Sequence, residues 1–361
     1  MGHVLAGGVL ATSGCQVVGI KAALPPEPLP DSPIIDMHCH ISGVGDDGSG
    51  CYINPRLMES WKAGPYLRAY GISRKILERD GDQAVVKQLV EWVRASKHVD
   101  GVVVLALDMT LTSAGEFDRE RTEIYVPNEF VATICKRFDC LHYGASVNPM
   151  RSDALERLEQ AKRDGAVLIK LLPAIQHIRL DDARFIPYFQ KLAELDLPLL
   201  THTGAERSFS SADHDAGDPV ALRLALDQGV TVIAAHMATT GSVDGERFMD
   251  RLLPLFQECP NLYADISSLT QVNKLGYLNE ILSRHPEVHD RLLYGSDYPL
   301  INTLLTSPWY FPGNLSPGQM WRLSRTRNPW DQDVQLKQAL GVPASVFSRP
   351  AKLLGLSLAE K

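Results

Sequence analysis

The chain has 361 residues, of which 45% are hydrophobic and 22% are charged, the balance of an ordinary globular protein. Its formal net charge is -7 and it contains no run of lysine and arginine, so it lacks the basic footprint of a nucleic-acid-binding protein. The 6 cysteines form no Cys-x-x-Cys pair, which argues against a disulfide scaffold, and no apolar run reaches the length of a transmembrane helix.

The N-terminal residues 1–30 are expected to lie outside the folded domain. Val4–Ala11 is apolar and precedes a Ser-Gly-Cys sequence ending at Cys15, which is typical of a signal peptide that ends at a lipid-modified cysteine. No lysine or arginine precedes the apolar stretch, however, and Thr12 stands where such motifs usually carry leucine. Two cellular locations therefore stay open: export with a lipid anchor at Cys15, and the cytoplasm. The lipid anchor is the one membrane attachment that we consider.

After the proline-rich stretch Pro25–Pro30, which predicts a linker, residues 31–361 are expected to form one domain. Short apolar runs alternate there with amphipathic segments, a pattern typical of strands and helices around a parallel sheet. The predicted strands are Ile34–His38, Val102–Leu107, His142–Val147, Ala166–Leu171, Pro198–His202, Val230–His236, Leu262–Ile266 and Arg291–Tyr294.

These eight β/α units predict an α/β fold, a closed (β/α)8 TIM barrel. An open doubly wound sheet is the main alternative, but no Gly-x-Gly-x-x-Gly follows the first strand. Long loops are expected after strand one, over residues 41–100, and after strand eight. Both begin at the carboxyl ends of neighbouring strands, where long loops usually shape the active site.

Polar side chains end five of the predicted strands. Alternation along strand one places His38 and His40 on the same side of the strand, facing the barrel interior. Each such residue alone is common by chance, but their occurrence together at the carboxyl ends of barrel strands predicts a metal site. The full set is His38, His40, Lys170, His202, His236 and Asp297.

Three imidazoles and one carboxylate, from His38, His40, His202 and Asp297, suit one divalent metal ion. Zinc is the first choice, with iron(II), manganese and cobalt as alternatives. Such an ion would acidify water near neutral pH. Asp297 is expected to bind the metal and to accept the proton of that water, while His236 could polarise a substrate oxygen or carry a proton.

The ordered set of Asp36-Met37-His38-Cys39-His40, Lys170, His202, His236 and Gly295-Ser296-Asp297-Tyr298-Pro299 resembles the amidohydrolase superfamily. More narrowly, it is similar to the amidohydrolase-related branch that includes aminocarboxymuconate-semialdehyde decarboxylase. The resemblance implies a (β/α)8 barrel with one or two divalent metals. It also implies that His38, His40, His202 and Asp297 are the ligands of a one-metal site and that His236 assists catalysis.

Lys170 is the ambiguous member of the set. In two-metal relatives a strand-four lysine is carboxylated and bridges both ions, so Lys170 would be a ligand only if carboxylated. His202 and His236 would then hold a second metal. An unmodified Lys170 is favoured, because members of this branch often work with one metal.

Other residues are weaker candidates. Arg207 follows His202 on the same loop and could hold an anionic substrate group, while Trp61 and Trp309 could wall the pocket. Asp36 could orient one of the histidines, or only cap the strand end.

Three functions compete. The first is hydrolysis of a C–N or C–O bond, in an amide, ester or lactone of a small molecule. The second is non-oxidative decarboxylation of an aromatic or enoic acid, which requires a cation such as Arg207 or Lys170. The third, a non-catalytic binding protein with a structural metal, is disfavoured by the open mouth and the spare His236. The expected partner is a small-molecule substrate and not nucleic acid, and a homo-oligomer is compatible with the sequence.

Overall fold

The structure is a computed structural model that describes residues 27–45, 48–61, 63–206, 208–209 and 212–357. The predicted signal segment with Cys15 lies outside the described residues. Glu27, in the predicted linker, packs against the domain: the side-chain amide of Gln338 donates to its carbonyl at 2.6 Å, and the backbone N–H of Ala344 donates to its carboxylate at 2.9 Å. None of the helices described is both long and apolar enough to cross a membrane.

Eight parallel strands form one sheet in the order β1-β3-β5-β6-β7-β8-β11-β12. Each overlaps one of the predicted apolar runs, which confirms the strand predictions. The strands are β1 (Ile35–His40), β3 (Gly101–Leu105), β5 (Leu141–Ala145), β6 (Ala166–Leu171), β7 (Leu199–Thr201), β8 (Val232–Ala234), β11 (Leu262–Asp265) and β12 (Leu292–Leu293).

The sheet curls until the backbone that follows β12 meets β1. The backbone N–H of His40 donates to the carbonyl of Tyr298, and that of Asp297 donates to the carbonyl of His38, each at 2.8 Å. Cys39 and Tyr298 also form an isolated parallel bridge. These contacts close the ring, so the prediction of a (β/α)8 barrel is confirmed.

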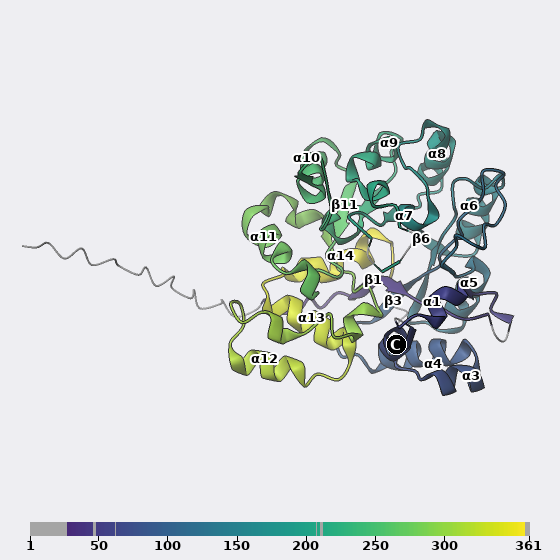
Figure 1. Ribbon diagram of the computed structural model, residues 1–361. Coiled ribbons are helices and arrows are strands. Elements are labelled where there is room, and N and C mark those ends of the chain that lie inside the picture. The colour runs from purple at the N-terminus through teal and green to yellow at the C-terminus, as the bar shows by residue number, and fades with distance from the viewer. Residues whose placement is uncertain (1–26, 46–47, 62, 207, 210–211, 358–361) are drawn as a thin grey trace, which may run out of the picture.

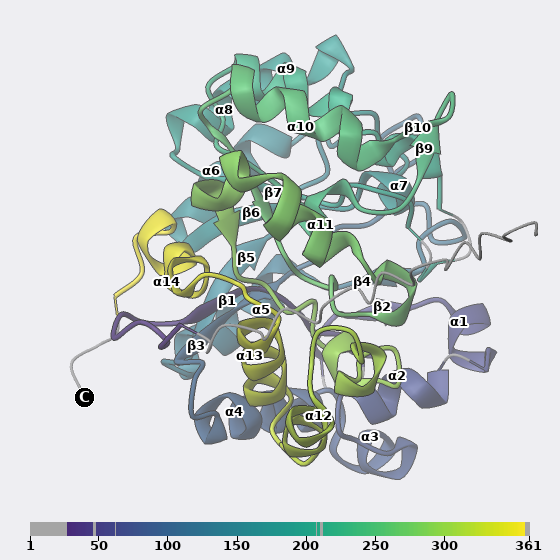
Figure 2. The same ribbon diagram turned by 90° about the vertical axis from the view of Figure 1, so that its left-hand side faces the viewer.

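Helices surround the sheet on its outer face (Figures 1 and 2). They are amphipathic: α10, for example, buries Phe248, Leu252 and Phe256 at a spacing of one turn. The helices of the barrel are α5 (Asn128–Arg137), α6 (Ala154–Arg163), α7 (Pro173–Gln176), α8 (Ile186–Glu194), α9 (Arg223–Asp227), α10 (Phe248–Glu258), α11 (Tyr277–Arg284) and α14 (Ala344–Leu353). The other strands form two antiparallel pairs, β2 (Tyr52–Ile53) with β4 (Ile124–Tyr125) and β9 (Ser242–Val243) with β10 (Glu246–Arg247).

The segments that follow β1 and β12 carry helices of their own. Residues 41–100 contain α1 (Pro55–Glu59), α2 (Ala63–Ala69), α3 (Arg74–Asp80) and α4 (Gln83–Ala95), and the segment after β12 contains α12 (Pro317–Ser324) and α13 (Pro329–Ala339). The start of α13 is tied to the end of α4, because the Asn328 side-chain amide donates to the Trp92 carbonyl at 2.7 Å.

The barrel interior is filled by apolar side chains, and Ala351 of α14 packs into the same cluster. The strand residues of this cluster are Ile35, Met37, Val103, Leu105, Leu168, Leu200, Ile233, Ala235 and Leu293. This apolar layer fills the interior beside the start of β1, and the histidines that line the pocket lie at the other end of that strand.

Candidate active site

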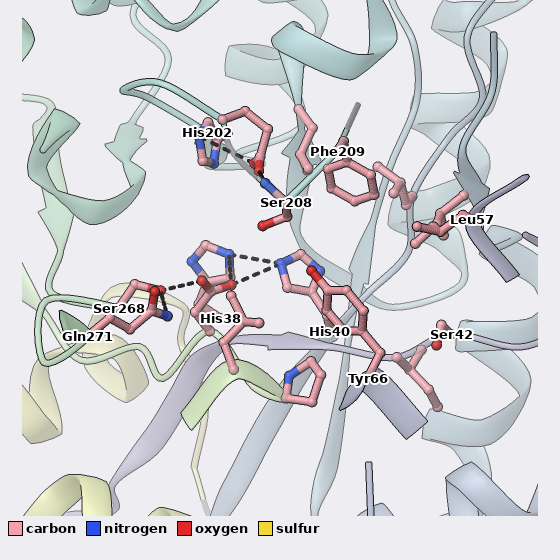
Figure 3. Close-up of a pocket in the computed structure, with 18 of the residues that line it drawn as sticks. His38, His40, Ser42, Leu57, Tyr66, His202, Ser208, Phe209, Ser268 and Gln271 are labelled. Carbon is pink, nitrogen blue, oxygen red and sulfur yellow. Dashed lines mark hydrogen bonds and ion pairs between the residues drawn. The ribbon is translucent and has the colours of Figure 1, made fainter. Parts of the chain in front are cut away.

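β1 brings two histidines to the mouth of the barrel. Ile35 and Met37 pack in the barrel interior, so strict alternation would turn His38 and His40 outward. The pairing of β1 with β3 is irregular between Asp36 and Cys39, however, and this bulge lets Met37 and His38 both face inward while Cys39 joins the outer core. The Nε2 atoms of His38 and His40 consequently lie 3.1 Å apart (Figure 3).

Asp297 completes a group with these histidines. Its Oδ1 lies 3.4 Å from Nε2 of His40 and 3.7 Å from Nε2 of His38. An ion with ligand bonds of about 2.0–2.1 Å in tetrahedral geometry separates neighbouring donor atoms by roughly 3.3 Å, so these spacings suit one shared ion. Asp297 is also held in left-handed backbone at φ 64°, a conformation that is uncommon for residues other than glycine.

His202 lines the same pocket but lies apart from that group. The structure brings ligand atoms of His38, His40 and Asp297 within 4.8 Å of one another; His202 is not among them. Its buried Nε2 makes no hydrogen bond within the described part of the chain, and Oε2 of Glu206 lies 3.5 Å away. Leaving a buried imidazole nitrogen unsatisfied is costly, which suits a lone pair kept for a ligand.

Lys170 reaches the ligand group from β6. Its Nζ lies 3.1 Å from Nε2 of His38. Burial lowers the pKa of Lys170 to about 8, against the opposing effect of the Asp265 and Asp297 carboxylates. Lys170 therefore adjoins the candidate ligands instead of lying on the far side of the pocket.

The protonation states match those of metal ligands. Burial lowers the pKa of His202 to about 4 and also lowers the pKa of His40, so both imidazoles are neutral at pH 7. Burial alone would raise the pKa of Asp297, but the hydrogen bond from His40 and the nearby imidazoles of His236 and His38 hold it well below its usual range. Neutral imidazole and ionised carboxylate are the forms that bind a cation.

Asp265, which the sequence analysis did not single out, orients His38. Nδ1 of His38 lies 2.7 Å from Oδ2 of Asp265 at the end of β11. Burial raises the pKa of Asp265, but its contacts with His38 outweigh burial and lower it below the usual range. A carboxylate on Nδ1 directs the Nε2 lone pair toward the site, the usual arrangement behind a metal-binding histidine. The signal was available, since Asp265 is the penultimate residue of the predicted seventh strand, Leu262–Ile266.

His236 follows β8 in strained backbone, with φ 58°, and Met237 after it has φ 52°. Nδ1 of His236 lies 2.7 Å from Oγ and 3.1 Å from the carbonyl of Ser267. The hydroxyl proton of Ser267 is directed to Asp265, so Ser267 accepts the Nδ1 proton of His236. Burial lowers the pKa of His236 well below its usual value, and the neutral ring therefore presents the lone pair of Nε2 to the pocket.

Asp36 has a different role from the one expected of it. Its carboxylate accepts from the backbone N–H of Ser296 at 2.8 Å, the Ser296 hydroxyl at 2.5 Å and the indole N–H of Trp330 at 2.8 Å. From His38 it accepts the backbone N–H, at 3.0 Å, and no histidine ring in the described part of the chain donates to it. Asp36 thus ties β1 to the turn that carries Asp297 and to α13, because each partner lies on a different element.

The pocket wall away from the histidines is apolar, and Tyr66 from α2 stands over it beside His40 (Figure 3). The hydroxyl of Tyr66 hydrogen-bonds with Ser208. Trp61 and Trp309, expected as pocket walls, do not line the pocket: they are 82% and 49% exposed. Arg207 lies outside the described residues. The apolar lining includes Leu57, Leu67, Ile124, Leu172 and Phe209.

The segment after β11 forms the remaining wall and was also missed from the sequence. The hydroxyl of Ser268 donates to Oδ2 of Asp297, and the side-chain amide of Gln271 donates to Oγ of Ser268 at 2.7 Å. Lys274 follows in the 3₁₀ turn Val272–Lys274 and also lines the pocket. This segment therefore fixes the carboxylate of Asp297 and adds a second cation to the site.

Comparison with known proteins agrees with the fold. The most similar solved structures include an uncharacterized TIM-barrel protein from Bordetella bronchiseptica, with 18% identity and a TM-score of 0.53 over 85% of this chain and 99% of that chain. A candidate 2-pyrone-4,6-dicarboxylic acid hydrolase from Pseudomonas putida has 16% identity and a TM-score of 0.52, over 91% and 100%. IDCase from Metarhizium anisopliae, in apo form, has 15% identity and a TM-score of 0.52, over 91% and 99%. At these identities the similarity shows the fold alone.

A comparison with curated protein sequences finds no match. The sequence model of the family described as Amidohydrolase, in contrast, matches residues 35–310, which include every strand of the barrel. The chain therefore belongs to the amidohydrolase family.

Proposed function

We propose that this protein is a metal-dependent hydrolase that breaks a C–N or C–O bond in an amide, ester or lactone of a small molecule. The observation that carries the proposal is the spacing of His38, His40 and Asp297, which suits one divalent ion at an open barrel mouth. We propose His202 as the fourth ligand because its buried Nε2 lines the same pocket. Three nitrogen donors and one oxygen donor favour zinc.

The residues of the site would have separate roles in hydrolysis. A divalent ion bound there supplies Lewis acidity, polarising a substrate carbonyl and acidifying water. Asp297 accepts the proton of the attacking water and passes it to the leaving group, while the hydroxyl of Ser268 holds its Oδ2 in place. His236 offers the lone pair of Nε2 to accept a hydrogen bond or a proton from water or substrate.

Non-oxidative decarboxylation of an acid is the second candidate. It is favoured by Lys170 and Lys274, two cations among the described residues that line the pocket. The same groups would then deliver a proton to carbon before CO2 leaves. A screen of lactones, amides, esters and aromatic acids, with both hydrolysis and CO2 release monitored, separates the two reactions. We expect turnover of a neutral C–O or C–N bond; CO2 release alone would replace the hydrolase proposal with decarboxylation.

The purified protein should contain about one equivalent of a transition metal, because the two groups of donor atoms spaced for an ion among the described residues, His38-His40-Asp297 and His38-His236-Asp265, share His38. Removing the metal with a chelator should lower the melting temperature, since a ligand that binds only the folded state stabilises it. Elemental analysis and thermal unfolding measure both effects. Two equivalents would point to a carboxylated Lys170, with His202 and His236 at the second ion. Failure to take up any metal from excess zinc would contradict the proposal.

Asp265→Asn should weaken metal binding by about 10- to 100-fold, the usual effect of removing a carboxylate behind a ligating histidine. The substitution keeps the shape of the side chain but removes the negative charge that fixes the Nδ1 proton of His38. Competition with a chromophoric chelator measures the affinity. Asp227→Asn, at a carboxylate that is 56% exposed and paired with Arg223, is the matched control. Equal affinities for the two variants would remove Asp265 from the site.

A further inference from the structure

A serine hydroxyl lies at the centre of a buried cluster behind the candidate metal ligands. Ser267 follows the end of β11, and its Oγ lies 2.7 Å from Nδ1 of His236 and 3.1 Å from Nδ1 of His38. The same hydroxyl donates its proton to Oδ1 of Asp265. All four side chains are buried. One hydroxyl therefore contacts two histidines of the site and the carboxylate that orients one of them.

The two carboxylate oxygens of Asp265 face different histidines. Oδ2 lies 2.7 Å from Nδ1 of His38, which is a direct hydrogen bond. Oδ1 accepts the backbone N–H of His236 at 2.8 Å, but it lies 3.9 Å from Nδ1 of that ring, which is too far for a hydrogen bond. The hydroxyl of Ser267 spans this distance. Ser267 is therefore the link through which the carboxylate of Asp265 reaches the ring of His236.

The groups around His236 determine which of its ring nitrogens carries the proton. The carbonyl of Ser267 lies 3.1 Å from Nδ1, and a carbonyl can only accept a hydrogen bond. The hydroxyl of Ser267 has its one proton on Asp265, so it too accepts from Nδ1. Both contacts place the proton of the neutral imidazole on Nδ1, and the lone pair is consequently on Nε2.

The same cluster also meets the spacing of a metal site, since His38, His236 and Asp265 offer ligand atoms within 4.8 Å of one another. The Nδ1 atoms of both histidines are engaged, however, that of His38 by Asp265 and that of His236 by Ser267. An ion bound between these Nδ1 atoms would have to displace both hydrogen bonds. We therefore assign this cluster as a hydrogen-bonded support behind the pocket.

We propose that Ser267 is the positioning residue of His236: its hydroxyl joins the ring to Asp265 and keeps the ring proton on Nδ1, so that Nε2 offers its lone pair to the substrate. Asp265 then supports both parts of the site, the metal through His38 and His236 through Ser267. This inference rests on the proposed function, in which Nε2 of His236 accepts a hydrogen bond or a proton, but it holds for hydrolysis and for decarboxylation alike.

S267A removes the hydroxyl and leaves Oδ1 of Asp265 two backbone donors, the N–H groups of His236 and Ser267. In the full-length zinc-loaded protein it should lower kcat on the best substrate of the screen by about 10- to 100-fold, the effect of losing one hydrogen bond in a charged network. Zinc affinity should stay unchanged, because His38 keeps its own hydrogen bond to Oδ2. In the His236→Asn background, S267A should lower kcat by less than about 2-fold, since residues that act as one unit are not additive.

T110V is the matched control, because it also removes one buried hydroxyl and leaves the charge unchanged. Thr110 donates to the carbonyl of Ile175 at 2.7 Å and does not line the pocket. Its variant should lose some thermal stability and keep the wild-type kcat. A wild-type kcat in S267A, a loss of zinc from S267A, or an equal effect of S267A with and without His236 would overturn the inference.

A second measurement does not depend on activity. Nitrogen-15 NMR of the histidine-labelled protein distinguishes the two neutral tautomers of an imidazole, and His236→Asn assigns the signals of this ring. In the metal-free wild type, His236 should carry its proton on Nδ1. In S267A only the carbonyl at 3.1 Å still accepts that proton, so the two tautomers should mix.

The NMR result separates this inference from the proposed function. A wild-type His236 ring that is protonated at Nε2, or an S267A ring with the signals of the wild type, would overturn the role of Ser267 whatever the activity. Failure to bind zinc or to convert any substrate would refute the proposed function alone, since the tautomer is measured without metal and without substrate.

Discussion

Asp297→Asn should lower kcat by about 10²- to 10⁴-fold, the range for loss of a positioned general base. Asparagine has nearly the same shape and can accept the hydroxyl of Ser268 through its amide oxygen, but it cannot take a proton from water. It also tolerates the left-handed backbone at this position, φ 64°, so the fold should survive. Activity on the best substrate of the screen, metal content and the melting temperature are the measurements.

Asp244→Asn is the matched control for that substitution. Asp244 also has left-handed backbone, with φ 50°, but it is exposed between β9 and β10 and does not line the pocket. Its variant should keep full activity and the same melting temperature. If Asp297→Asn retained wild-type turnover, Asp297 would not be the proton acceptor and the proposed mechanism would be wrong.

His236→Asn should lower kcat by a similar factor, about 10²- to 10⁴-fold, while metal content stays unchanged. The substituted amide can still donate to Ser267 and accommodates φ 58°, but the Nε2 lone pair is lost. His236 does not belong to the group of His38, His40 and Asp297, so one bound ion should remain. Kinetics and elemental analysis of the same preparation measure both quantities.

The His236→Asn experiment also separates three interpretations of the site: a one-metal enzyme, a two-metal enzyme and a binding protein with a structural metal. His177→Asn is the control, since His177 has left-handed backbone with φ 52° and does not line the pocket. A fall in activity together with the loss of one of two ions would indicate a two-metal site with a carboxylated Lys170. An unchanged His236→Asn variant in every assay would favour a binding protein with a structural metal.

The barrel was predictable because parallel strands buried on both faces appear in the sequence as short apolar runs. The approach of His38, His40 and Asp297 was predictable for a related reason, since strand ends in a closed ring meet at one mouth. The sequence does not explain, however, why the two histidines of β1 face inward. Alternation from Ile35 would turn both histidines outward, and a bulge, which leaves no clear mark in the sequence, reverses their direction.

The residues that were missed or misplaced depend on contacts between distant segments. Asp265 contacts His38 of β1, and the charge of Lys274 acts on His236, which follows β8. Such contacts cannot be derived from the local pattern around either residue. Trp61 and Trp309 were expected in the pocket from aromatic character alone. That character does not specify whether a loop folds over the mouth or away from it.

The hydrogen bonds of Asp36 join the first strand of the barrel to two segments that are synthesised much later, the turn at Ser296 and helix α13. A nascent chain emerges from the ribosome with its first strand complete, but the partners of that strand at Ser296 and Trp330 are still unmade. The segment of β1 that carries His38 therefore gains these contacts only after residues 296–330 have been synthesised. A truncated product that ends before α13 would carry each proposed ligand in its sequence and still lack the brace that aligns them.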